Sequence, residues 1–163
     1  MDASVTLRPP RIGDIGWIVH RQAVLYTQEY GWNAEFEGLI AIIAGQFIRD
    51  FDPARERCWI ADRDGEMLGS IFLVRQDDAV AKLRVLYVEP AARGLGIGQA
   101  LVTECVSTAR ALGYRRLTLW TNDILTAART LYERAGFRLI HQAPHHSFGH
   151  DLVEQTWDLD LAD

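Results

Sequence analysis

Three glycines stand at alternate positions in 93-RGLGIG-98, directly after an arginine and directly before a run whose apolar spacing predicts a helix. Glycine is a poor helix former and adds entropy to the unfolded chain, so three of them together cost on the order of a few kcal/mol. Bare backbone at the start of a helix lets an anion approach, because the first N–H groups lack acceptors and the helix dipole is positive there. The pattern indicates a loop that binds phosphate groups.

The glycine spacing separates the known kinds of phosphate loop. A Walker-type loop ends in Gly-Lys followed by Ser or Thr, whereas Gly98 precedes Gln99 and Ala100. A dinucleotide fingerprint is G-x-G-x-x-G with an acidic residue about 20 positions later, and the G-x-G-x-G of this chain is spaced differently. These differences disfavour both nucleotide hydrolysis and dinucleotide binding.

Two segments together indicate a known family. The stretch 86-LYVEPAARGLGIGQALV-102 resembles the V-x-P-x-x-R-G-x-G-I-G signature of the GCN5-related N-acetyltransferase (GNAT) family, and 128-ARTLYERAGF-137 resembles its A-x-x-L-Y-E-x-x-G-F pattern. Residues 26–32 and 144–161 further resemble the acetyltransferase domains that are fused to MarR-type DNA-binding domains in bacterial regulators. No such DNA-binding domain is recognisable in this sequence. The resemblance implies an N-acetyltransferase with acetyl-coenzyme A (acetyl-CoA) as co-substrate.

The same resemblance implies a cofactor site between a strand and the helix that follows it. Residues 86–88 would pair with the pantetheine arm, with one backbone N–H facing the thioester oxygen, and the N–H groups of residues 94–100 would hold the pyrophosphate. The residues expected to bind acetyl-CoA are Leu86, Tyr87, Val88, Arg93, Gly94, Leu95, Gly96, Ile97, Gly98, Gln99, Ala100, Asn122, Ala128 and Tyr132.

Tyr132 has the catalytic role in this resemblance, as the general acid that protonates the departing sulfur during direct transfer in a ternary complex. A phenol pKa of about 10 is close enough to that of a thiol for this step. Many family members have Asn seven positions before the tyrosine, where this chain has Leu125. We expect Asn122, one helical turn earlier, to replace that asparagine.

In the family, the first two helices and the loop between them cover the acceptor amine. Glu29, Glu35 and Glu37 are therefore candidates for the base that deprotonates the amine, although each also suits a solvated surface or a helix dipole. These glutamates and the net charge of −5 favour a cationic amine over a polyanion as acceptor. The residues expected to contact the acceptor are Glu29, Tyr30, Trp32, Glu35, Trp120 and His146.

Two alternatives are open at this point. The segment 145-HHSFGH-150 brings three histidines together, but neighbouring residues in a strand point to opposite faces and no fourth ligand is visible, so we expect no metal. The likeness to the MarR-fused domains supports a second function, a regulatory domain that senses acetyl-CoA or another metabolite with little or no turnover. In that case Tyr132→Phe would leave turnover unchanged.

Apolar periodicity and turn residues predict the elements that position these residues. The order β-α-α-β-β-β-α-β-α-β-β predicts the α/β class, a mixed sheet with helices on both faces, and a parallel strand-helix-strand crossover, as in the GNAT fold. We expect a strand around Val5 and Leu7, helices that begin at Asp14 and Asn33, a hairpin over 57–76 that turns at Asp64-Gly65, a strand at 80–90, a helix at 97–112, a strand at 116–121, a helix at 125–134, and strands near 137–142 and 153–161.

Composition limits the class of protein. With 163 residues, of which 48% are apolar, we expect one domain over residues 1–163. The chain lacks the basic field that nucleic-acid binding needs, and Cys58 and Cys105 are expected to be small buried hydrophobes. Because no leader and no apolar run of about 18 to 20 residues is present, we expect a cytoplasmic protein without membrane attachment. The family resemblance also makes a homodimer through the C-terminal strands an option.

Overall fold

Helices and strands follow one another in the predicted order throughout residues 4–162, which the computed structural model describes. The elements are β1 (Thr6–Arg8), α1 (Asp14–Tyr30), α2 (Ala34–Asp50), β2 (Arg57–Arg63), β3 (Glu66–Arg75), β4 (Val80–Val88), the short 3-10 helix η1 (Pro90–Ala92), α3 (Ile97–Ala111), β5 (Arg116–Asn122), α4 (Thr126–Ala135), β6 (Arg138–Ser147) and β7 (His150–Asp160). The strands form one seven-stranded sheet in the order β1-β2-β3-β4-β5-β7-β6.

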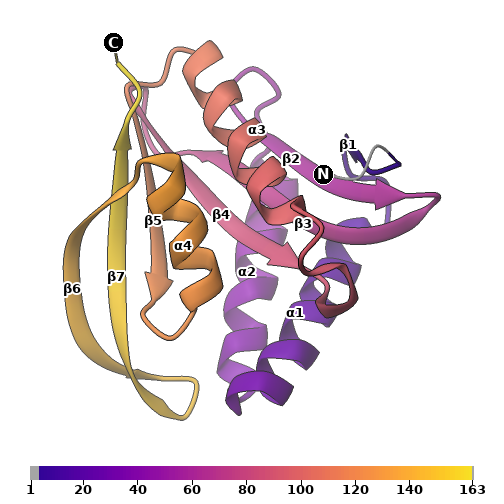
Figure 1. Ribbon diagram of the computed structural model, residues 1–163, viewed down its shortest axis with the longest axis vertical. Coiled ribbons are helices and arrows are strands. Elements are labelled where there is room, and N and C mark those ends of the chain that lie inside the picture. The colour runs from indigo at the N-terminus through magenta and orange to yellow at the C-terminus, as the bar shows by residue number, and fades with distance from the viewer. Residues whose placement is uncertain (1–3, 163) are drawn as a thin grey trace.

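Helices cover both faces of this sheet (Figure 1). On one face, α3 and α4 lie over a large apolar cluster that includes Leu101, Cys105 and Leu117. On the other face, α1 and α2 contribute Ile18 and Phe47 to a second cluster with Phe72 of β3. Both cysteines are free and buried, which confirms the prediction that they are apolar core residues.

The predicted hairpin and crossover are both confirmed. β2 and β3 pair antiparallel across Asp64 and Gly65, whose φ angles of 54° and 85° are those of a two-residue turn that matches the sheet twist. β4 and β5 pair in parallel through the crossover helix α3. The prediction for Asn33 is also confirmed, because its side chain caps α2 by accepting the Glu35 N–H at 3.0 Å.

The start of α1 differs from the prediction that Asp14 caps it. Gly13 is the capping residue, with a left-handed backbone, and Asp14 is the first residue of the helix. The Asp14 carboxylate points back to accept hydrogen bonds from the Arg11 N–H at 2.7 Å and from Arg8 at 2.8 Å. It therefore stabilises the segment before the helix.

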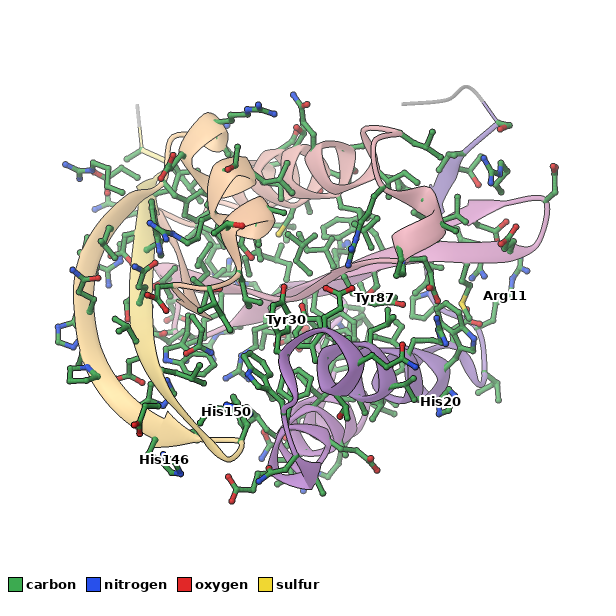
Figure 2. All side chains as sticks on the ribbon, turned by 60° about the horizontal axis from the view of Figure 1, so that its bottom comes forward. Arg11, His20, Tyr30, Tyr87, His146 and His150 are labelled. Atoms are coloured by element: carbon green, nitrogen blue, oxygen red, sulfur yellow. The ribbon has the colours of Figure 1, made fainter. Side chains whose placement is uncertain are left out.

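The last hairpin is longer than the sequence predicts. After a register shift between Leu139 and His141, β6 and β7 pair up to a two-residue turn at Phe148 and Gly149, where the sequence led us to expect a loop. Both turn residues have positive φ, at 58° and 83°, and a phenylalanine in that position is not a sequence signal for a tight turn. The hairpin curves around one end of the sheet, and its tip reaches the two N-terminal helices (Figure 2).

β4 and β5 separate soon after they pair. Their register joins only Val80 to Arg116, Ala81 to Leu117 and Lys82 to Thr118, although both strands continue well beyond these pairs. The carboxyl-terminal parts of β4 and β5 are therefore not paired with each other. They leave a gap in the middle of the sheet.

A bulge in β4 lies beside the gap. Because Ser70 pairs with Tyr87 and Phe72 with Arg84, two residues of β4 lie opposite Ile71 alone. One of them, Val85, has a φ of 53°, a conformation that β-branched residues rarely adopt. Strained backbone of this kind is found mostly where a site requires it.

Candidate active site

A cavity of about 890 Å³ lies at the gap between β4 and β5. It is lined by residues from α1, α2, β4, β5, α4, β6 and β7, so that segments far apart in the sequence share it. Tyr132 of α4 is on its wall, together with Trp32 and Phe36 from the α1–α2 region. The cavity thus has access to both faces of the sheet.

The loop after β4 presents a row of free backbone donors. Gly94 and Gly96 have φ angles of 83° and 78°, which only glycine adopts without strain. The six consecutive N–H groups from Gly94 to Gln99 make no hydrogen bond to any of residues 4–162, and Gly96 caps α3 without a side-chain bond. Ala100, which was expected to offer its N–H as well, donates it to the Gly96 carbonyl at 3.1 Å. Six donors at a helix N-terminus form a site for an anion.

The third glycine of the loop has a packing role. A Cβ atom at Gly98 would lie 2.7 Å from Cδ1 of Leu131, on the neighbouring helix α4. The absence of a side chain at this position lets α3 and α4 approach each other. From the sequence we expected all three glycines to contact phosphate. The role of Gly98 in helix packing became visible only in the structure.

Ion pairs fasten this loop to α1. Arg93 lies 2.6 Å from Glu29, and Arg21 forms two hydrogen bonds, of 2.6 and 3.0 Å, with Glu89 just ahead of η1. Bidentate pairs of this kind fix geometry as well as adding energy. Glu29, expected on the acceptor side, therefore lies at the loop and does not line the cavity.

The other predicted cofactor residues lie around the gap. Leu86 and Ala128 line the cavity, while Leu95 and Val88 pack against the apolar cluster under α3. Tyr87 is buried on the opposite side, where its ring lies 6.4 Å from that of Trp17. Tyr87 does not line the cavity, and its carbonyl oxygen lies against Gly69 of β3.

Tyr132 is buried, with 5% of its surface exposed. Its hydroxyl donates no hydrogen bond to any residue that the structure describes. Burial, followed by the nearby Tyr26 and Cys105, raises the pKa of its phenol well above the ordinary value. The phenol therefore stays protonated at neutral pH and has a proton to donate.

Aromatic rings enclose the far side of the cavity. Trp32 is 2% exposed, and its ring lies 5.0 Å from that of Phe36 and 4.8 Å from that of Phe148 at the hairpin tip. Burial raises the pKa of Tyr26, which is stacked on Phe36, to about 12. Tyr30 packs against Trp32 but does not itself line the cavity.

The glutamates proposed as bases have other positions. Glu35 accepts the Phe148 N–H at 2.9 Å and so holds the hairpin tip against the start of α2. Glu37 is on the outer surface. The carboxylates that do line the cavity are Glu154 and Asp158 of β7, which the sequence did not single out.

The three histidines of the hairpin separate from one another. His145 lines the cavity, where Nε2 lies 2.8 Å from Oδ1 of Asn122 and Nδ1 lies 3.0 Å from Oγ of Ser147. His146, the residue we expected at the acceptor, pairs with Asp151 on the outside, and His150 lies against the Gly31 carbonyl (Figure 2). If the hairpin had been predicted at its correct length, the alternation of side chains along β6 would have identified His145, and not His146, as the histidine that faces the cavity.

Asn122 and Trp120 complete this wall. Asn122 is 1% exposed, lines the cavity and holds His145, while Leu125 precedes α4 without a side-chain cap. Trp120 is 47% exposed and donates its indole N–H to Glu154 at 3.1 Å. Among the described residues, no three His, Cys, Asp or Glu side chains converge as they would around a metal ion.

Two cations on β4 were missed by the sequence reasoning. Lys82 and Arg84 alternate with Leu83, which is buried under α3, so both point into the cavity from the opposite face. Burial lowers the pKa of Arg84, and burial together with the Arg84 charge lowers the pKa of Lys82. The sequence K-L-R inside a predicted strand could have indicated them, because it places two cations on the same face of the sheet.

The split sheet, the row of free donors and the buried tyrosine define a class of protein. The chain belongs to the acetyltransferase (GNAT) family, whose model matches residues 20–137. An uncharacterised N-acetyltransferase of Schizosaccharomyces pombe is 31% identical over 115 residues, which are 69% of this chain and 70% of the relative. A mycothiol acetyltransferase of Beutenbergia cavernae is 37% identical over 101 residues, which are 61% of this chain but only 33% of the relative.

Solved structures share the fold at low sequence identity. The protein yncA of Salmonella typhimurium, solved with its cofactor acetyl-CoA, has a TM-score of 0.74 at 19% identity, over 99% of this chain and 96% of its own. An N-acetyltransferase of Staphylococcus aureus Mu50 has a TM-score of 0.78 at 18% identity, over 98% of this chain and 100% of its own. Within residues 4–162, no helix is both long and apolar enough to span a membrane.

Proposed function

We propose that this chain transfers the acetyl group of acetyl-CoA directly to a primary amine. The observation that carries the proposal is the cavity between β4 and β5, with a buried, protonated tyrosine on its wall and a row of free N–H groups in the loop that follows β4. The N–H groups are suited to a pyrophosphate and the tyrosine to a leaving thiolate. Membership of the acetyltransferase family supports the same chemistry.

The residues around the gap fit acetyl-CoA. The N–H groups from Gly94 to Gln99 would hold the pyrophosphate, and the free edge of β4 at residues 86–88 would pair with the pantetheine arm. The bulge at Val85, whose φ angle is positive, interrupts the pairing of β4 with β3 next to the cavity. The bound co-substrate would supply an acetyl group activated as a thioester.

The proton on the amine goes to His145 in this proposal. In this proposal the ring carries its proton on Nε2 and donates it to Oδ1 of Asn122, so that the Nδ1 lone pair faces the Ser147 hydroxyl. The ring can therefore accept a proton through Ser147. As the new N–C bond forms and the C–S bond breaks, Tyr132 donates its proton to the sulfur.

Tyr132→Phe tests the assignment of the acid. The change removes only the hydroxyl, and general acid catalysis contributes roughly a hundredfold or more to rate, so kcat should fall by that order. Release of free thiol from acetyl-CoA, measured against a panel of primary amines, reports kcat. Binding of acetyl-CoA, measured by calorimetry, should change little.

Tyr114→Phe is the matched control. Tyr114 is also buried, but it lies outside the cavity and its hydroxyl donates to the Arg55 carbonyl at 2.7 Å. This variant should turn over at the wild-type rate at temperatures where it is folded. Equal kcat values for wild type and Tyr132→Phe would rule out the tyrosine as the acid.

A further inference from the structure

Lys82 and Arg84 bring two positive charges into the acceptor side of the cavity without a counter-charge. Neither side chain makes a hydrogen bond or an ion pair with any residue that the structure describes. Arg84 is half-buried, and burial is the cause that lowers its pKa. A guanidinium in such a place loses hydration and gains no partner in return.

The two carboxylates that line the same cavity form no ion pair with Lys82 or Arg84. Oδ2 of Asp158 lies 3.6 Å from Arg116, while its Oδ1 is buried without a hydrogen-bond partner, and Glu154 accepts the indole N–H of Trp120. The Lys, Arg, Asp and Glu side chains on the wall are Lys82, Arg84, Arg116, Glu154 and Asp158, so three cations face two carboxylates. The excess lies on β4.

The phosphates of the co-substrate do not account for these cations. Leu83, between them, is buried in the cluster beneath α3, so Lys82 and Arg84 face away from α3 and its phosphate-binding N-terminus. They lie instead on the face that α2 covers, opposite Leu39, Ile40 and Ile43. This is the face on which the acceptor would enter.

We propose that Arg84, with Lys82 beside it, binds a carboxylate group of the acceptor, so that the substrate is an amino acid rather than a simple amine. The proposal rests on the proposed function, in that it takes this cavity as the acceptor site. Arg84 directly precedes the bulge at Val85, so the carboxylate is bound close to where the amine reacts. The planar guanidinium matches a carboxylate through two parallel hydrogen bonds.

The aromatic wall suggests which amino acids to use as probes. Trp32, Phe36 and Phe148 line the rest of the pocket, and such rings accept apolar and aromatic side chains. The proposal therefore narrows the expectation of a cationic amine, which came from the net charge and from glutamates that lie elsewhere, to an amine that also has a carboxylate.

Matched pairs of ligands test the proposal without requiring turnover. Leucine and leucinamide, and phenylalanine and phenylalaninamide, differ mainly in the carboxylate. Each is titrated into the full chain saturated with CoA, and binding is followed by the fluorescence of Trp32 and Trp120 on the cavity wall. We expect the acid of at least one pair to bind about tenfold more tightly than its amide, as a charge-assisted hydrogen bond allows.

Arg84→Gln should remove this difference by weakening the acid about tenfold and leaving the amide unchanged. Arg84→Lys should retain part of the preference, because the charge stays while the second parallel hydrogen bond is lost, and this separates lost charge from lost folding. Arg138→Gln is the control, because Arg138 is exposed and outside the cavity. Amides that bind as well as acids, no binding of either member of any pair, or equal losses for acid and amide in Arg84→Gln would each overturn the proposal. Thiol release that is absent with every amine would instead contradict the proposed function.

Discussion

At the residue scale, the loop after β4 depends on two glycines that hold the backbone in a left-handed conformation. Gly94 and Gly113 form a matched pair, because their φ angles are 83° and 88° and a Cβ atom would meet nothing within 4 Å at either position. Alanine at each should cost about 1 kcal/mol of unfolding free energy, since the strain is the same. The two positions differ only in their surroundings.

Gly94→Ala should weaken acetyl-CoA binding, whereas Gly113→Ala should not. A methyl group at Gly94 would stand beside the free N–H groups from Gly94 to Gln99, where the pyrophosphate is proposed to lie. Titration calorimetry with acetyl-CoA measures the affinity, and urea unfolding confirms that both variants lose similar stability. Equal affinities for the two variants would exclude this loop as the phosphate site.

Single residues also show how far sequence reasoning reached. The pattern that contains Arg93, Gly94 and Gly96 was recognisable because glycines at alternate positions, between an arginine and a helix, are typical of a phosphate-binding loop. His145 was missed in favour of His146, since which histidine faces the cavity depends on where the hairpin turns. Lys82 and Arg84 were missed because charged residues in a strand are usually solvated.

At the element scale, the contact between α3 and α4 is as important as the loop that precedes it. The Cβ of Gly98→Ala would lie 2.7 Å from Cδ1 of Leu131, so Leu131 must move out of its packed position. We expect the variant to lose about 1 kcal/mol of unfolding free energy, since overpacking outweighs the gain in helix propensity. Urea unfolding measures this loss.

The Leu131→Ala background provides the test of the cause. Once the leucine is shortened, Gly98→Ala should stabilise the chain by about 0.5 to 1 kcal/mol, the ordinary effect in a helix. Gly45→Ala in α2, where a Cβ atom meets nothing within 4 Å, should stabilise by the same amount in both backgrounds. The packing explanation fails if Gly98→Ala has the same effect with and without Leu131.

The elements themselves were largely predictable, while their deviations from regularity were not. Asp64-Gly65 and Asn33 carry local turn and capping signals, and the structure confirms both. The divergence of β4 from β5 and the bulge at Val85 arise from tertiary packing, which leaves no signal in a period-two pattern. The cavity is a consequence of these two deviations.

At the scale of the whole molecule, the proposed reaction requires segments from both ends of the chain. Arg93 and Arg21 join the loop after β4 to α1, and Glu35 joins α2 to the tip of the C-terminal hairpin. These contacts place the N-terminal helices against both the phosphate loop and the hairpin that carries His145. In the proposed reaction, the acceptor and the co-substrate would thus meet between the N-terminal helices, the loop after β4 and the C-terminal hairpin, which these contacts hold in place.

The measurement that tests the central claim most directly is the stoichiometry of the reaction catalysed by the full chain. Wild-type protein is incubated with acetyl-CoA and a panel of amino acids and simple amines, and free thiol and acetylated amine are quantified together. We predict that at least one amine yields both products in equal amounts. Tight binding of acetyl-CoA without amine-dependent thiol release across the panel would contradict the transferase and identify a sensing domain instead.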